Sequence, residues 1–253
     1  MKGIDKFQSA ITKTAQTIWL PFVEERREEF GEILKNYILE LEGPKHIDRK
    51  MSDSELYFRK IFDGFLEITA SLQTLEDIAF YISRFPFSDE KVTPERYLQF
   101  HVEAYYSEIY ILRERLKKYL KLLERRHKNK PAFQFVKNVS EDLSNLLETS
   151  LKPVITLRGK HIHETRFKDE NISLLGSLGM FSKEIYDGED EFAKLFKAYY
   201  REKYRDVKKN WKNTAKNNNK NIRELLDHFF EKLYPIVFEK DTGAFLYLGR
   251  FKK

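Results

Sequence analysis

A segment near the middle of the chain, residues 157–166, gathers side chains that could perform acid–base and phosphate chemistry. Its candidate residues are Arg158, Lys160, His161, His163, Glu164 and Arg166. A guanidinium can bind two phosphate oxygens and stabilise the charge of a transition state, and an imidazole can move protons near neutral pH. With RNA the 2′-hydroxyl supplies the nucleophile, so this set could cleave a phosphodiester without a metal. The alternative is a surface helix end with ordinary ion pairs.

The spacing of Arg158 and His163 resembles a known family motif. Arg158-x4-His163, followed by Glu164 at the end of a long amphipathic helix, is similar to the Arg-x4–6-His motif of the HEPN superfamily over residues 143–167. The resemblance implies an all-α, metal-independent endoribonuclease of the kind found in toxin–antitoxin, phage-defence and CRISPR-associated systems. It implies Arg158 and His163 as the catalytic pair. The other four candidates would bind substrate. Gly159 stands where the family usually has Asn, Asp or His.

The same resemblance implies an RNA substrate and a homodimer that brings two motifs into one cleft, with no metal or cofactor. An antitoxin or a nucleotidyltransferase-like protein is a possible partner. Two alternatives stay open. The first is a catalytically silent helical module that binds a nucleotide, RNA or a partner protein. The second is a helical interaction protein outside this superfamily, whose basic segments meet an acidic partner.

The Arg-x4-His pattern occurs three times, and its surroundings favour one copy. The copies are Arg96 and His101, Arg158 and His163, and Arg223 and His228. In a regular helix, residues five apart point roughly 140° away from each other. The outer copies lie in well-patterned helices, so each pair should diverge. The middle copy follows Pro153, which removes a backbone hydrogen bond and predicts a kink or a stop in the helix.

Two basic segments are the strongest charge signal in a chain of net charge +6. Residues 113–130 hold nine basic and two acidic side chains, and residues 201–223 hold the same numbers, so each segment has net charge +7. Segments of this kind can neutralise phosphates, which predicts RNA as a partner. The alternative is that they are solvated faces of helices.

Helical periodicity predicts the elements that position these residues. Between Thr93 and Arg126, apolar residues recur at alternating spacings of four and three, which predicts a helix of about eight turns. They are Leu98, Val102, Tyr105, Ile109, Leu112, Leu116, Tyr119 and Leu123. Further helices are expected over about 5–17, 21–41, 54–85 (as one long helix or two), 136–157 and 189–240. The expected fold is therefore an all-α bundle of long amphipathic helices.

Three local expectations refine that bundle. Asn217–Asn219 are poor helix formers and predict a loop or a frayed stretch. Phe192, Leu195 and Tyr199 share one face of the helix that begins near Glu189, which predicts an apolar packing face. Ala244–Phe251 is the only strand-like segment, so little or no strand is expected.

Composition excludes several other classes of protein. The chain has no cysteine, which excludes disulfides, thiol catalysis and zinc–thiolate sites. Its longest uncharged stretch, Asn171–Ser182, is shorter than the ~18 residues that span a bilayer. Charges near the N-terminus argue against a signal peptide, so we expect a cytoplasmic protein with no membrane contact. No linker is evident, so residues 1–253 are expected to form one domain, with a helical extension over 1–90 and C-terminal helices over 189–240.

Overall fold

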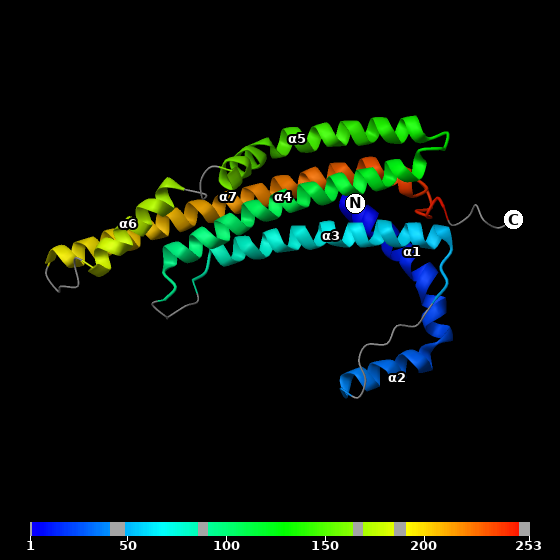
Figure 1. The fold of residues 1–253 in the computed structure, drawn as a ribbon, viewed down its shortest axis with the longest axis horizontal. Coiled ribbons are helices and arrows are strands. Elements are labelled where there is room, and N and C mark those ends of the chain that lie inside the picture. Colours follow the sequence, from blue (N-terminus) through cyan, green and yellow to red (C-terminus); the bar gives the residue numbers. More distant parts are fainter. Residues whose placement is uncertain (1, 41–48, 86–90, 164–168, 185–190, 248–253) are drawn as a thin grey trace. The chain divides into compact units, whose positions relative to one another are not determined.

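In the computed structural model, residues 2–40, 49–85, 91–163, 169–184 and 191–247 are described. For 155, 157–163 and 181–184 only the backbone is described. Nearly all of these residues are helical, which confirms the predicted all-α fold (Figure 1). The helices are α1 (Gly3–Glu25), α2 (Arg27–Ile38), α3 (Asp53–Ile82), α4 (Pro94–His127), α5 (Phe133–His163), α6 (Glu170–Glu184) and α7 (Glu191–Val237). Little or no strand is predicted near the C-terminus, and the described part has an isolated bridge between Phe238 and Phe245.

The chain divides into two compact units, each assembled from separate segments. The first unit contains residues 1–66, 129–139 and 225–253, and the second contains residues 67–128 and 140–224. Helices α3, α5 and α7 each contribute residues to both units. Three of the four boundaries therefore fall inside helices, and the fourth follows the end of α4.

Aromatic side chains build the core of the first unit. The fully buried ring of Phe7 in α1 lies 5.5 Å from Phe65 of α3 and 4.8 Å from Phe230 of α7, measured between ring centroids. The N-terminus of α1 approaches α7 so closely that a Cβ at Gly3 would lie 1.9 Å from the carbonyl oxygen of Asp227. Only glycine leaves room for that contact.

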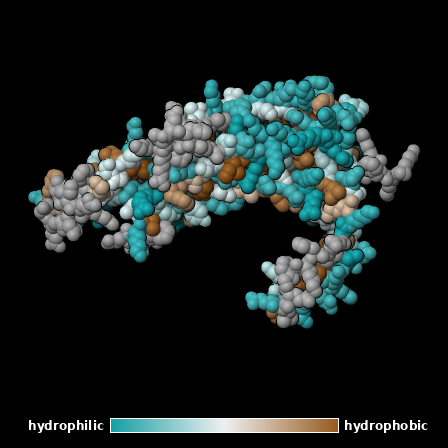
Figure 2. Space-filling view, viewed as in Figure 1, coloured by the Kyte–Doolittle hydropathy of each residue, from teal (hydrophilic) through white to brown (hydrophobic). Residues whose placement is uncertain are grey.

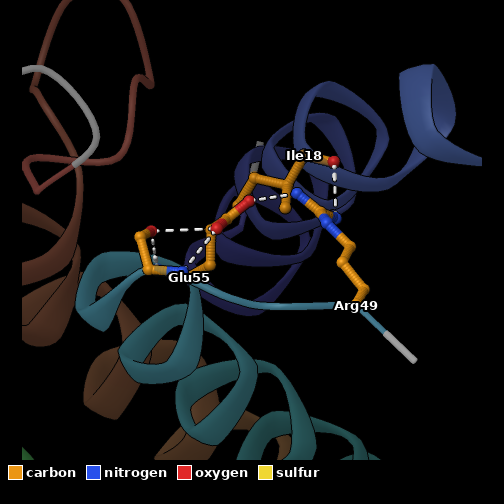
Figure 3. A network of polar contacts seen from close by, with 4 residues as sticks. Ile18, Arg49 and Glu55 are labelled. Atoms are coloured by element: carbon orange, nitrogen blue, oxygen red, sulfur yellow. Dashed lines mark hydrogen bonds and ion pairs between the residues drawn. The ribbon is translucent and has the colours of Figure 1, made fainter.

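A capping box begins α3. The backbone N–H of Ser52 donates to Glu55 Oε2 over 2.8 Å, and the N–H of Glu55 donates to Ser52 Oγ over 3.3 Å. This reciprocal pair satisfies two of the backbone donors that a helix N-terminus leaves unpaired. Arg49 adds an ion pair to Glu55 and donates to the carbonyl oxygen of Ile18 over 3.1 Å, so it fastens α1 to the start of α3 (Figure 3).

The N-terminal helix runs past the point where the sequence predicts its end. The separate helices predicted over 5–17 and 21–41 imply a break at Trp19–Pro21, but α1 continues through Pro21 to Glu25. Trp19 packs against Phe58 and Phe62 of α3, with ring centroids 5.9 and 4.9 Å away. This packing offsets the backbone hydrogen bond that Pro21 removes.

The second unit is organised around α4. All eight apolar positions of the predicted stripe are at most 2% exposed, so the periodicity prediction is confirmed. Ser71 of α3 donates to Glu108 of α4 over 2.6 Å, and α6 packs on α4 as well. The polar faces of the helices carry the charged side chains, and hydrophilic residues cover most of the face seen in Figure 2. In the described residues, no helix is long and apolar enough to cross a membrane.

Candidate nucleic-acid interface

The residues that the sequence singles out for cleavage lie at the end of α5 or beyond it. Positions Arg158, Lys160, His161 and His163 belong to the last turns of this helix. Glu164 and Arg166 lie outside the described residues. The backbone therefore places the first four on one helix, and the geometry of their side chains remains a prediction.

Of the kink or stop predicted at Pro153, the stop is wrong, because α5 is helical from Phe133 to His163. A proline inside a helix costs about 3 kcal/mol through its lost hydrogen bond and its clash with the preceding turn. Leu147 and Leu151, just before the proline, are 0% and 6% exposed. Burial of each stabilises this part of α5 by about 1.5–3 kcal/mol, which offsets the penalty. Positions 158 and 163 are therefore rotated by roughly 140° about the helix axis.

The two other Arg-x4-His copies lie in regular helices, as the sequence predicts. Arg96 donates to the carbonyl of Lys91 over 3.4 Å, while the ring of His101 packs 4.3 Å from that of Tyr97. Burial lowers the pKa of His101. Arg223 pairs with Glu76 over 2.8 Å. Arg96, His101 and Arg223 thus use their side chains in hydrogen bonding, packing or ion pairing.

Part of the first basic segment is structural. Arg113, which is buried, and Lys117 both pair with Glu148 of α5. Arg115 pairs with Glu67 of α3 over 3.5 Å. The hydrogen bonds from Lys117 and Arg113 hold the pKa of the Glu148 carboxyl below its usual value. These three cations connect α4 to its neighbours inside the second unit.

Four of the remaining six cations of the first segment share one outer face at the C-terminal end of α4 and just beyond it. This face is here called the α4 stripe, and it consists of Lys118, Lys121, Arg125 and Lys128, all exposed. At 100° per residue the four positions fall within an arc of about 80°. The arc lies opposite the buried apolar stripe of α4, so its charges point to solvent.

The second basic segment forms a longer and more regular stripe on α7. The α7 stripe consists of Arg201, Arg205, Lys209, Lys212, Lys216 and Lys220, all exposed. At 100° per residue they fall within an arc of about 100°, and at 1.5 Å per residue they extend over about 28 Å. Among these six cations, the described part of the chain places an acidic side chain at ion-pair distance only from Lys220, with Glu224 at 3.9 Å. Glu202 and Asp206 lie along one edge.

The inner side of α7 holds the stripe on the outside of the second unit. Val207, Ala215 and Ile222 are buried on that side. At its N-terminal end, Tyr200 donates from its hydroxyl to Glu95 Oε2 of α4 over 2.7 Å. Burial, assisted by this hydrogen bond, raises the pKa of Tyr200 well above its ordinary value.

The predicted loop at Asn217–Asn219 is wrong, because α7 is continuous through it. The side chain of Asn219 accepts a hydrogen bond from the hydroxyl of Tyr105 over 2.6 Å and donates to the carbonyl oxygen of Leu75 over 3.1 Å. These two bonds supply partners that an asparagine otherwise seeks in a turn. They join α7 to α4 and α3 and keep the stripe in register.

The expected packing face at the start of α7 is also wrong. Phe192, Leu195 and Tyr199 are 57%, 65% and 46% exposed. The buried side of this segment carries Ala193 instead. The periodicity of the three residues is real, but they belong to an outer face.

Sequence reasoning missed a group of exposed rings on α3 and α4. Phe80, Tyr81 and Phe100 are 56%, 44% and 66% exposed, and His101 lies between them. Phe80 and Phe100 do not share the spacing of the buried positions of their helices. This difference from the spacing of the buried residues is the feature of the sequence that could have predicted their exposure.

Two further observations bear on chemistry. No group of three His, Asp or Glu side chains that could hold a metal ion occurs in the part of the chain that the structure describes. His127, the histidine of a possible Glu-x-x-His metal motif, is buried and its Nδ1 lies 2.7 Å from the carbonyl oxygen of Leu123.

No protein-family model, curated protein or solved structure matches this chain.

Proposed function

We propose that this protein binds RNA through the α7 stripe. The observation that carries the proposal is the alignment of six exposed cations along one face of a helix whose inner side is fixed by burial. Cations in such a row can each neutralise a phosphate of one strand and release its counterions. RNA is the polyanion that the sequence resemblance implies, and a cytoplasmic location belongs to the same proposal.

The form of the stripe favours a nucleic acid over a lipid surface. A helix that lies in a membrane interface presents an apolar face beside its basic face. Along Arg201–Lys220 the apolar face of α7 is buried inside the second unit. A row of about 28 Å, with a cation roughly every 6 Å, fits a linear chain of phosphates instead.

The test is a variant in which Lys209, Lys212 and Lys216 are changed to glutamine. At about 0.1 M salt each lost phosphate contact lowers the binding constant about fivefold, so we expect about 100-fold weaker binding of a single-stranded RNA. A matched control changes the exposed lysines Lys13, Lys60 and Lys240 to glutamine and removes the same net charge.

The control separates local contacts from overall charge. Equal loss of affinity in both variants would contradict a specific stripe. Unchanged RNA binding in the first variant, with loss of an acidic protein partner, would identify the stripe as a protein interface.

Cleavage of the bound RNA by Arg158 and His163 is the second proposed function. Both positions belong to the same unit as the α7 stripe. They lie on a helix and roughly 140° apart, so one copy of the chain presents them in different directions. The proposal therefore requires a homodimer in which Arg158 of one copy and His163 of the other meet at one phosphate.

A mixing experiment tests this arrangement. Arg158→Ala and His163→Ala should each be inactive alone in the presence of EDTA. Mixed together, they form heterodimers in which one composite site holds both an intact arginine and an intact histidine, so cleavage should return. Active single variants, or mixtures that stay inactive while heterodimers form, would contradict the composite site.

A further inference from the structure

Rings from α3 and α4 form a connected group at one end of the second unit. It is here called the aromatic patch and consists of Phe80, Tyr81, Phe100 and His101. Phe80 lies 6.0 Å from Tyr81, Tyr81 lies 5.4 Å from His101, and Phe100 lies 5.3 Å from His101, between ring centroids. Three of the four rings are at least 44% exposed. Exposed aromatic rings in contact with each other mark a binding surface.

The charges beside the patch indicate what it binds. The guanidinium of Arg84 lies over the ring of Phe80, 5.1 Å from its centroid. Arg96 is exposed one turn before Phe100 on the same face of α4. The acidic residue closest in sequence to Phe80 on its own face, Asp77, accepts a hydrogen bond from Gln73 over 3.0 Å. Rings with adjacent guanidinium groups suit a ligand that is flat, aromatic and anionic.

The outer face of α4 connects the patch to further positive charge. Phe100 and Lys118 are 18 residues apart, which is five whole turns and about 27 Å along one face. The exposed cations of the α4 stripe continue from Lys118. Glu103 and Glu114 are the acidic residues on this path: Glu103 accepts a hydrogen bond from Gln99 over 2.6 Å, and Glu114 pairs with Arg113. One nucleic-acid strand along this face could place the bases of some nucleotides on the rings and the phosphates of others on the cations.

We propose that the aromatic patch stacks unpaired bases, so that the RNA bound by this protein is single-stranded. Bases that are free of a duplex stack on Phe, Tyr and His rings and on guanidinium planes, whereas the bases of a duplex are already stacked on one another. Burial lowers the pKa of His101, which keeps its ring neutral at physiological pH. This inference rests on the proposed RNA-binding function and adds the class of RNA.

The test removes two exposed rings without disturbing the core. Phe80→Ala/Phe100→Ala changes side chains that are 56% and 66% exposed, and the control Tyr37→Ala/Phe135→Ala changes rings that are 57% and 54% exposed in the first unit. One stacked base contributes roughly a five- to 150-fold change in affinity. We therefore expect single-stranded RNA to bind at least tenfold more weakly to the first variant. Duplex affinity should stay within about twofold, and the control should match the wild type.

A fluorescent base analogue, 2-aminopurine, provides the second readout. Its emission in a single-stranded RNA should change when wild type binds and should change less with the patch variant. Unchanged single-strand affinity in the patch variant would overturn the inference. If the variant with Lys209, Lys212 and Lys216 changed to glutamine still bound RNA more weakly, the proposed RNA binding through the α7 stripe would hold without a role for the aromatic patch. A smaller oligomer with unchanged RNA affinity would assign the patch to a protein interface and overturn the inference equally.

Discussion

The helical phase of the α7 stripe can be tested by counting phosphate contacts. Each contact to a single strand contributes about −0.7 to the slope of log K against log salt. If all six cations of the stripe contact phosphate, the slope is about −4, and affinity falls about 300-fold between roughly 50 and 200 mM salt. With Lys209, Lys212 and Lys216 changed to glutamine, the slope falls to about −2 and the loss to about 20-fold.

Two lysines on the same helix provide the internal control. The ammonium of Lys203 lies 5.7 Å from the centroid of the Tyr199 ring, and that of Lys208 lies 5.2 Å from the Tyr204 ring. Both are outside the arc of the stripe and half-buried. Changing both to glutamine removes two charges from the same basic segment, yet the slope should stay near −4.

The assay is fluorescence anisotropy of a labelled single-stranded RNA at several salt concentrations, with circular dichroism to show that each variant is folded. A slope proportional to the total number of cations removed, whatever their phase, would refute the reasoning. The segment would then act as a diffuse positive charge and α7 would have no binding face. A wild-type slope near zero would exclude phosphate contacts altogether.

Three further outcomes are expected. Arg158→Ala/His163→Ala should lower RNA cleavage in EDTA by about 10²–10⁴-fold, while the melting temperature and the RNA affinity of the protein stay unchanged. The products of the wild type should carry 2′,3′-cyclic phosphate ends, and an inactive wild type would contradict this prediction. Burial raises the pKa of Tyr204 to about 12, so the free energy of unfolding in urea should fall as pH rises from 10 towards 12, and less steeply in Tyr204→Phe. Burial lowers the pKa of His101, so the melting temperature should be retained above pH 6.5 and should decline below it. In His101→Gln this decline of the melting temperature at low pH should be smaller.

Much of the fold follows from hydrophobic periodicity. The α4 pattern from Leu98 to Leu123 predicted both the helix and its buried face, because eight apolar residues in phase leave a single way to cover them. Local breakers were less informative. Pro21, Pro153 and Asn219 all lie inside helices. Their penalties are a few kcal/mol at most, which tertiary burial and side-chain hydrogen bonds can offset.

The candidate site was only partly predictable from the sequence. Net charge identified both basic segments, but it could not separate Lys208 from Lys209, since neighbouring residues differ by 100° around the helix. Nor could it show that Arg113 pairs with Glu148, which lies 35 residues further along the chain. The exposure of Phe192 was missed because helical phase alone does not tell which of two apolar faces meets the core.

The two basic segments have the same net charge, and their difference lies in where their acids are. In the first, the acids that matter come from other helices: Glu67 and Glu148 approach from α3 and α5 and bind the cations on the flanks of α4. In the second, Glu76 of α3 pairs with Arg223 beyond the end of the stripe, while Glu202 and Asp206 belong to α7 itself and remain at the edge of the stripe. An ion pair between helices takes a cation away from solvent and fixes it. A cation without such a partner keeps its hydration and its counterions, which are what a phosphate chain displaces when it binds. The α7 stripe therefore holds the charge that an RNA can use, while much of the charge of the first segment is already committed to holding the second unit together.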